Sequence, residues 1–387
     1  MIRFMRNASF RFLAPLGMCL PILATTSANA EETVNGRPAV VLESPAAKMV
    51  IDLGGGSIVD FHLAAGGLNP LRWIGPADAE KELRPMAHFL CLDRWGQPSE
   101  AELRNGMPYH GEATRVRWKQ SGAAERRDGG VTAGMDASLP MAGLDVHRTV
   151  RLSVASALFS VSETVTNRNK LGRVYNMVQH PSIGPPFLDE TTVVDSNAQR
   201  GLTQSSPMPN PEKPELRWPA ALNKGKPVDL RRLTNDPDPN VVSFVVDEEL
   251  GWVTAVNASK ELLLGYIWKT AEYPWLNIWR HVENGKPLAR GLEFGTTGLH
   301  QPFSVLTKKP HVFGRPTFTY LDAGESATRS YDAFLAKVPP DFRGVDRVTH
   351  RGSQLVIRER GSAREVAIPA DRLFFSGLAQ DGVRRDP

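Results

Sequence analysis

Short runs of β-forming residues dominate the pattern of hydrophobic and polar positions along the chain, and long helical periodicity is nearly absent. The runs are rich in valine, isoleucine, threonine and aromatic residues, and glycine, proline, asparagine and aspartate separate them. The pattern predicts strands at Ala39–Leu42, Lys48–Leu53, Ser57–Leu63, Ala113–Gln120, Val146–Ser153, Leu158–Asn167, Val241–Val246, Leu262–Trp268 and Thr317–Leu321.

The run from Val146 to Val154 shows most clearly how such strands are expected to pair. Its even positions are apolar and its odd positions polar, with Arg148 as the single exception. Strict alternation is typical of a half-buried antiparallel strand, because successive side chains point to opposite faces of a sheet. We therefore predict an all-β fold built from antiparallel sheets.

The loops between the predicted strands are rich in proline, as in the stretches 181–186, 207–219 and 236–240. Loops on an all-β scaffold are where binding residues are often found. Residues 347–370 resemble one hairpin, with strands at Gln354–Arg358 and Arg364–Ile368 around Gly361. The predicted organisation is one large β domain over residues 31–345, followed by a hairpin and tail over residues 346–387.

The first thirty residues have the composition of a secretory signal peptide. Arg3, Arg6 and Arg11 form a basic start, Phe12–Ala24 is mostly apolar, and Ala28-Asn29-Ala30 is a small-x-small cleavage site. The sequence thus predicts export of the mature chain, to the periplasm or out of the cell. A lipoprotein signal through Leu16-Gly17-Met18-Cys19 is the weaker alternative, because Met18 is bulky for the residue before a lipidated cysteine.

Loss of the signal changes the charge and the cysteine content of the chain. The net charge falls from +4 to +1 because three arginines leave with the signal, and Cys91 becomes the only cysteine. We expect Cys91 to be a buried apolar residue. With no long basic run and no apolar stretch of membrane-spanning length after residue 30, the sequence predicts neither a nucleic-acid partner nor a membrane span.

Glu293 is the only acidic residue between Leu288 and Phe303, and it stands in a strand-like stretch just before a glycine-rich turn. Strand alternation predicts that its side chain shares a face with those of Ala289 and Gly291. A carboxylate on such a face is costly to bury unless it has a partner or a function. The two interpretations are a structural ion pair, with Arg290 or Arg280 as partner, and an acid–base catalyst.

Three further polar residues occur in turn-rich settings: Arg94 in Leu92-Asp93-Arg94-Trp95-Gly96, His110 in Pro108-Tyr109-His110-Gly111, and His180 in Gln179-His180-Pro181. Their order, with Thr166-Asn167 ahead of His180 and Leu292-Glu293 late in the chain, resembles the aldose 1-epimerase (galactose mutarotase) superfamily, including its glucose-6-phosphate 1-epimerase-like branch. The stretch from Gln179 to Gly184 departs from the aromatic-rich sequence usual in that superfamily, and its substrate-binding aspartate has only Asp236 and Asp238 as positional candidates.

The resemblance implies an antiparallel β-supersandwich with a sugar cleft on one sheet, and a reaction that interconverts sugar anomers without a cofactor or metal. It assigns Glu293 as the base for the C1 hydroxyl and His180 as the acid for the ring oxygen. It makes His110 and Arg94 substrate-binding residues, and Trp279, Trp95 or Trp275 could offer a flat face to a sugar ring. We expect Glu293 and His180 on opposite sides of the bond that joins C1 to the ring oxygen.

Other functions remain compatible with the same residues. The chain could be a carbohydrate-binding protein that keeps the cleft but lacks turnover, or, by analogy of fold, a polysaccharide lyase. Two histidines and a glutamate could also form a zinc site, although no HExxH-type spacing supports it. His281 and His300, which flank Glu293 in the sequence, are the replacements for His180 as the acid.

Overall fold

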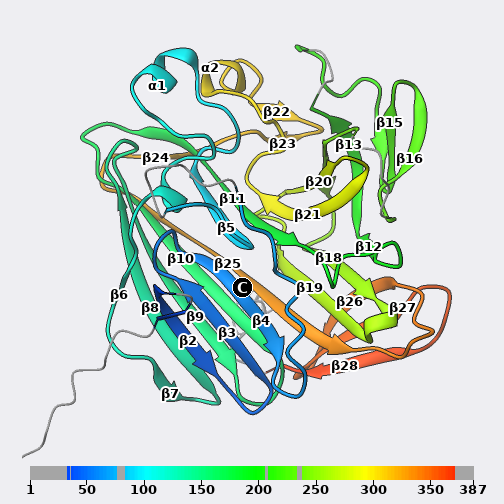
Figure 1. Ribbon diagram of the computed structural model, residues 1–387. Helices are drawn as coiled ribbons and strands as arrows, with labels where there is room; N and C mark the ends of the chain where they lie inside the picture. The colour runs from blue at the N-terminus through cyan, green and yellow to red at the C-terminus, as the bar shows by residue number, and fades with distance from the viewer. Residues whose placement is uncertain (1–32, 35, 76–82, 205–207, 233–237, 371–387) are drawn as a thin grey trace, which may run out of the picture. The chain divides into compact units, whose positions relative to one another are not determined.

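The computed structural model describes residues 33–34, 36–75, 83–204, 208–232 and 238–370. The predicted signal peptide and the end of the predicted C-terminal tail, residues 371–387, lie outside this part of the chain. Two large antiparallel sheets face each other and make up most of the described structure (Figure 1). None of the helices among the described residues has the length and apolar character needed to cross a bilayer.

The larger sheet has twelve strands. In spatial order they are β1 (Thr33–Val34), β2 (Arg37–Glu43), β3 (Ala47–Asp52), β4 (Ser57–Leu63), β5 (His88–Asp93), β11 (Arg173–Ile183), β21 (Lys286–Gly295), β20 (Trp275–Glu283), β17 (Val241–Val246), β13 (Ala198–Thr203) and β14 (Leu216–Arg217), with β24 (Thr319–Leu321) paired to the end of β11.

The smaller sheet has nine strands. Their order is β12 (Val193–Ser196), β18 (Leu250–Asn257), β19 (Leu262–Lys269), β25 (Ser326–Lys337), β10 (Leu158–Asn167), β9 (Leu144–Ser153), β8 (Gly130–Leu139) and β6 (Lys119–Gln120), with β7 (Glu125–Arg127) paired to β8.

The remaining elements are short. They are the hairpins β15 (Ala220–Asn223) with β16 (Lys226–Asp229) and β22 (His311–Val312) with β23 (Arg315–Pro316), the helices α1 (Glu100–Arg104) and α2 (Phe303–Leu306), and the 3-10 turns η1 (Ala113–Arg115) and η2 (Ala258–Lys260).

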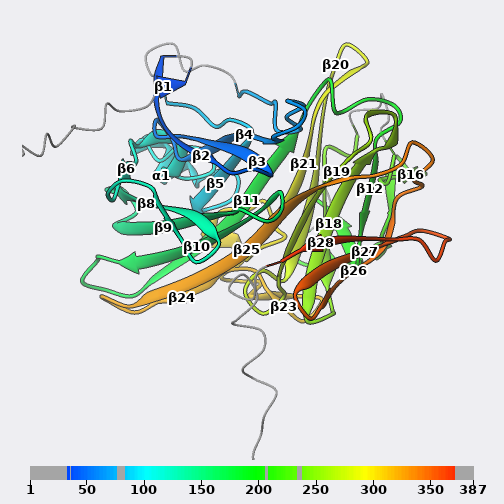
Figure 2. The ribbon, with the colours of Figure 1, turned by 90° about the horizontal axis from the view of Figure 1, so that it is seen from below.

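The main hydrophobic core fills the space between the two sheets. Along β21, Leu292 and Phe294 point into this core, and so do Ile278 and Leu276 on the neighbouring strand β20. A second cluster lies on the far side of the nine-stranded sheet, where β26 (Val345–Arg351), β27 (Gln354–Glu359) and β28 (Glu365–Pro369) pack against β18 and β19 (Figure 2). The predicted C-terminal hairpin therefore has a third strand, β26, which the sequence pattern did not indicate.

Most predicted strands are confirmed, but the one at Ala113–Gln120 is wrong. Residues 113–115 form η1, and only Lys119–Gln120 joins a sheet. The segment instead makes local contacts: the indole Nε1 of Trp118 donates to the carbonyl of Ala113, 2.9 Å away. The composition of this segment is strand-like, but only its last two residues make the backbone hydrogen bonds of a strand.

Arg148, the polar exception in the alternating run from Val146 to Val154, has a buried partner in the structure. Arg148 on β9 points inward as the pattern of its neighbours requires, and it is buried. Its Nε donates to Oε1 of Glu163 at 2.7 Å, directly across the β9–β10 ladder. Glu163 also accepts from Nε2 of Gln179 at 2.6 Å. A buried polar network therefore links the two sheets behind β11.

Candidate functional site

A cavity of about 260 Å³ lies on the face of the twelve-stranded sheet that points away from the core, over β5, β11, β21 and β20. We call it the central cavity. Most of its lining is aromatic: Trp73, Pro85, Phe89, Trp95, Tyr109, His110, Arg115, His180, Asn240, Val241, Trp279, Glu293 and His300.

Strand register explains why residues from distant parts of the sequence meet here. Phe89 on β5 is paired with His180 on β11, and the two rings stack at 4.1 Å. On the other side of β11, Glu293 projects from β21 on the same face as Gly291, as predicted. A Cβ atom at Gly291 would lie 2.9 Å from Oε1 of Glu293 and 3.0 Å from Cβ of Trp279, so glycine leaves room for both side chains.

Glu293 is almost completely buried, with one hydrogen-bond donor and one histidine beside its carboxyl group. Its Oε2 accepts from the indole Nε1 of Trp95 at 2.7 Å, and its Oε1 lies 3.1 Å from Nε2 of His180. Burial raises the pKa of Glu293 well above its usual value, and the hydrogen bond from Trp95 opposes this shift only in part. The ion pair with Arg290 or Arg280 does not form, because those arginines are cross-strand neighbours on the opposite face of the sheet.

His180 is held by a second contact on its far nitrogen. Its Nδ1 lies 3.0 Å from Oγ of Ser182, and that hydroxyl is within 3.4 Å of the carbonyl of His180. Burial lowers the pKa of His180 to about 3. Burial thus shifts the two pKa values in opposite directions, and each shift favours the neutral form of its group.

His110 occupies a turn that fixes its tautomer. His110 and Gly111 both have left-handed backbone, with φ of 66° and 78°, and a Cβ at Gly111 would lie only 1.9 Å from the carbonyl oxygen of Leu92. The Nδ1 of His110 accepts a hydrogen bond from the backbone N–H of Gly96 at 3.0 Å. Because burial lowers the pKa of His110, the ring is neutral and its remaining proton is on Nε2.

His300, which the sequence offered as a replacement for His180, also lines the cavity. Its Nε2 lies 3.0 Å from the hydroxyl of Tyr109, and its ring packs on that of Trp95 at 4.6 Å. Burial lowers the pKa of His300 to about 4. The second replacement, His281, does not line the cavity; it pairs with Glu283 at 2.9 Å and stacks on the far side of Trp279.

Arg94 is not brought to the cavity. Its guanidinium is 4 % exposed and pairs with Asp93 at 2.7 Å and Glu102 at 2.8 Å. Through these contacts Arg94 links α1 to the end of β5. The arginine that does line the cavity is Arg115, whose Nη1 donates to the carbonyl of Leu83 at 3.0 Å.

Of the three tryptophans proposed as a sugar platform, Trp279 and Trp95 line the cavity and Trp275 does not. Trp275 is fully buried, and its Nε1 donates to the carbonyl of Pro316 at 2.7 Å. Sequence reasoning missed Trp73, whose ring lies 5.2 Å from that of Trp279 and 6.5 Å from that of His180. Trp73 lies outside the sequence motifs, so only its position in the folded structure identifies it as a residue of the cavity lining.

Cys91 is buried beneath the cavity as a free thiol, in the small cluster of Phe89, Trp95 and Val178. Asp238 lies in a neighbouring cavity, and Asp236 falls outside the described residues. Among the described residues, no group of three His, Cys, Asp or Glu side chains is arranged to hold a metal ion, so the zinc hypothesis gains no geometric support.

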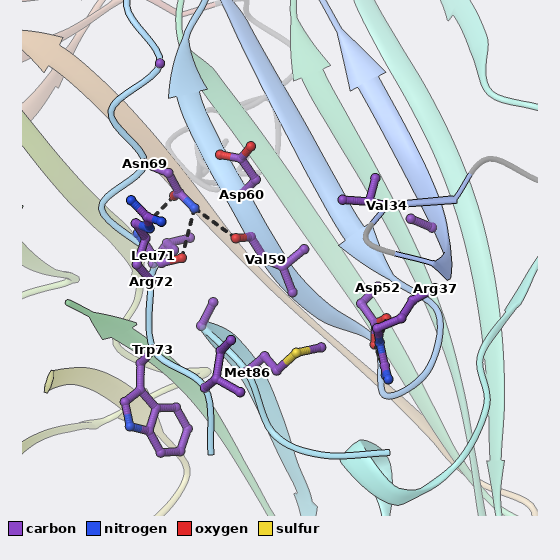
Figure 3. A pocket seen from close by; sticks show the side chains of 14 residues that line it. Val34, Arg37, Asp52, Val59, Asp60, Asn69, Leu71, Arg72, Trp73 and Met86 are labelled. Carbon is purple, nitrogen blue, oxygen red and sulfur yellow. Dashed lines mark hydrogen bonds and ion pairs between the residues drawn. The ribbon is translucent and has the colours of Figure 1, made fainter. Parts of the chain in front are cut away.

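A larger cavity of about 480 Å³ lies next to the N-terminal strands and shares Trp73 with the central cavity (Figure 3). Three of its charged side chains already have partners, because Arg37 binds Asp52 at 2.6 Å and Asp60 contacts His62 at 2.8 Å. Figure 3 shows the side-chain amide of Asn69 bonded within the wall, to the carbonyls of Val59 and Leu71. This cavity lacks the acid–base groups of the central one.

A model of a protein family, described as "Domain of unknown function (DUF4432)", matches residues 91–304. The matched segment contains Arg94, His110, His180 and Glu293. None of the curated proteins matches the sequence.

Solved structures give the fold a clear counterpart. A galactose mutarotase-like protein from Clostridium acetobutylicum matches with a TM-score of 0.58 at 14% identity, covering 80% of this chain and 98% of its own. A galactose mutarotase related enzyme from Lactobacillus acidophilus matches with a TM-score of 0.56 at 12% identity, covering 78% and 98%. A galactose mutarotase-like protein from Lactobacillus casei matches with a TM-score of 0.53 at 15% identity, covering 77% and 100%. The predicted galactose mutarotase-like β-sandwich is thus confirmed.

Proposed function

Because the chain belongs to the DUF4432 family and has the galactose mutarotase-like fold, we propose that it is an exported enzyme that interconverts the anomers of a sugar without a cofactor. The observation that carries this proposal is the contact between Glu293 and His180 at the base of an aromatic cavity. Export rests on the predicted signal in residues 1–30.

The pair of Glu293 and His180 has the groups that ring opening requires. The reaction takes a proton from the C1 hydroxyl and gives one to the ring oxygen, so an acid and a base must act on one sugar. In the proposed mechanism Glu293 and His180 together hold one proton, which they share. Its transfer from Oε1 of Glu293 to Nε2 of His180, across 3.1 Å, produces a carboxylate base and an imidazolium acid. This transfer leaves the net charge of the buried pair unchanged, which avoids the cost of an unpaired charge.

The neighbouring side chains support this chemistry. Ser182 accepts from Nδ1–H of His180 and so stabilises the imidazolium form. The Nε2–H of His110 is free of the backbone contact made by Nδ1 and can donate to a sugar oxygen on which negative charge develops. Trp73 and Trp279, whose rings are at 80° to each other, offer apolar faces for a sugar ring.

The proposal predicts an unusual pH dependence of the anomer exchange rate. The pair keeps one proton at every pH between the pKa of His180, about 3, and the raised pKa of Glu293. We therefore expect an enzymatic rate that is constant between these two pKa values and that falls as the pH rises through the raised pKa of Glu293, when the pair gives up its only proton. NMR exchange spectroscopy on a panel of sugars, corrected for the uncatalysed rate, measures this profile. A profile without such a plateau would contradict the shared-proton pair.

Trp95→Phe tests the alkaline limb of that profile. The indole N–H donates to Oε2 of Glu293 and so favours the carboxylate form. Its removal should raise the pKa of Glu293 further and move the alkaline loss to higher pH, while the ring still fills its place. Exchange measured from neutral to alkaline pH in both proteins gives the comparison, and an unmoved limb would mean that another group controls it.

A carbohydrate-binding protein without turnover is the second candidate. The observation that favours it is the direct contact between Glu293 and His180. A sugar would have to approach an acid and a base that already contact each other. Calorimetric binding of a sugar, together with no acceleration of its anomer exchange, would select this alternative.

A further inference from the structure

A third cavity, of about 390 Å³, continues the central cavity on one side. Asn240, Val241 and His300 line both, so the two spaces share a wall. We call it the flanking cavity. Its other lining residues come from the end of β13, from the tip of the β15–β16 hairpin and from the segment before β17: Thr203, Gln204, Leu222, Asn223, Lys224, Asp238 and Pro239.

The chemistry of the flanking cavity differs from that of its neighbour. The central cavity is lined mainly by aromatic rings, whereas the lining residues of the flanking cavity carry amides, a hydroxyl, an ammonium and a carboxylate. Lys224 and Asp238 contribute opposite charges, so the lining has no net charge. Hydrogen-bonding groups without net charge suit the hydroxyls of a neutral sugar.

The shared wall is held in place by hydrogen bonds between groups of the protein itself. The side-chain amide of Gln204 donates to Oγ of Ser243 at 2.7 Å and to the carbonyl of Gly298 at 2.9 Å, and it accepts from the backbone N–H of His300 at 2.8 Å. Nδ2 of Asn240 donates to the carbonyl of Arg280 at 2.8 Å. A wall fixed in this way loses little conformational entropy when a ligand binds.

The sizes of the two cavities point to a ligand with more than one ring. At about 260 Å³, the central cavity is just below the range of roughly 300–1,000 Å³ that is typical of ligand pockets. It suits a single sugar ring, and the flanking cavity adds a larger space beside it.

We propose that the flanking cavity is a subsite for a second sugar ring, and that the substrate is therefore a neutral reducing oligosaccharide rather than a free monosaccharide. This inference rests on the proposed function. The reducing-end ring lies in the central cavity with its C1 hydroxyl at Glu293 and His180, because that hydroxyl has to be free. The next ring, linked through another hydroxyl, lies across His300 and Asn240.

The test compares anomer exchange for glucose, galactose and mannose with exchange for reducing disaccharides that end in each of them. We expect kcat/KM to be at least tenfold higher for a disaccharide than for its reducing-end monosaccharide. Asn223→Trp should fill the flanking cavity and abolish this advantage without changing the monosaccharide rate. Ala220→Trp, at an exposed position of the same hairpin that does not line the cavity, is the matched control.

Lys224→Gly provides a second variant that does not add bulk. Lys224 has left-handed backbone with φ of 48°, which glycine adopts without strain, so the change removes the side chain and its ammonium group without straining the turn. It should lower the disaccharide advantage severalfold. Together the two variants separate a filled subsite from a misfolded hairpin.

The outcomes distinguish this inference from the function on which it rests. Equal kcat/KM for monosaccharides and disaccharides, unchanged by Asn223→Trp, overturns the subsite and leaves the epimerase proposal standing. No exchange with any sugar overturns the epimerase proposal. In that case calorimetry decides: tighter binding of a disaccharide, weakened by Asn223→Trp, supports the subsite, and equal or absent binding overturns it.

Discussion

Glu293→Gln is expected to lower the enzymatic rate of anomer exchange by about 10²–10⁴-fold, the usual contribution of an acid–base group. The amide keeps the size of the carboxyl group and can still accept from Nε1 of Trp95, but it cannot exchange a proton with His180 as the proposed mechanism requires. The fold should remain intact, because the substitution removes an ionisable group that burial already disfavours in its charged form.

Polarimetry or NMR exchange on the sugar panel measures this loss, and circular dichroism checks the fold. Glu283→Gln is the matched control, since Glu283 is an exposed residue at the end of β20 that pairs with His281 and does not line the central cavity. The control should exchange anomers at the wild-type rate. Equal rates for Glu293→Gln and wild type would remove Glu293 from the reaction and with it the proposed mechanism.

Glu163→Gln is expected to destabilise the protein by about 3–5 kcal/mol, because it leaves the buried guanidinium of Arg148 without its counter-charge. The side chains of Arg148 and Glu163 are 3 % and 0 % exposed, and they face each other between the two sheets. The amide of Gln179 would also lose its contact with a charged acceptor. Urea or guanidinium denaturation, followed by circular dichroism, gives the change in the free energy of unfolding.

The double variant Arg148→Met/Glu163→Leu tests whether charge is the cause. Two apolar side chains of similar size remove both charges, and replacement of a buried ion pair in this way is often neutral or stabilising. We expect it to recover most of the stability that Glu163→Gln loses. If the double variant is less stable than Glu163→Gln, packing around the pair matters more than its charge.

Much of the fold could be predicted because strand periodicity is a local property. The alternation over Val146–Val154 predicted the buried and exposed faces of β9, and it indicated Arg148 as an exception. The partner of Arg148 could not be predicted in the same way, because Glu163 reaches it through strand register. The segment after Ala113 shows the opposite case, in which a strand-like composition has no neighbouring strand to bond with along most of its length.

The candidate site was predicted in part, for a related reason. Glu293, His180 and His110 were identified from their motifs and Trp279 as one of three candidate tryptophans, and the structure brings all four to one cavity. Trp73 was missed and Arg94 was included, although the guanidinium of Arg94 forms ion pairs with Asp93 and Glu102. Residue type suggests what a side chain can do, but its neighbours decide whether it is available.

The sequence by itself determined the all-β class, the face of the strand on which Glu293 lies, and the chemical groups that serve an acid–base site. These properties depend on residues within a few positions of one another along the chain. Only the tertiary structure decided that Glu293 lies 3.1 Å from His180 and accepts a hydrogen bond from Trp95, which is 198 residues away in the sequence. Such contacts follow from the pairing of β5, β11 and β21, and the burial that this pairing causes is what shifts the pKa values of both residues.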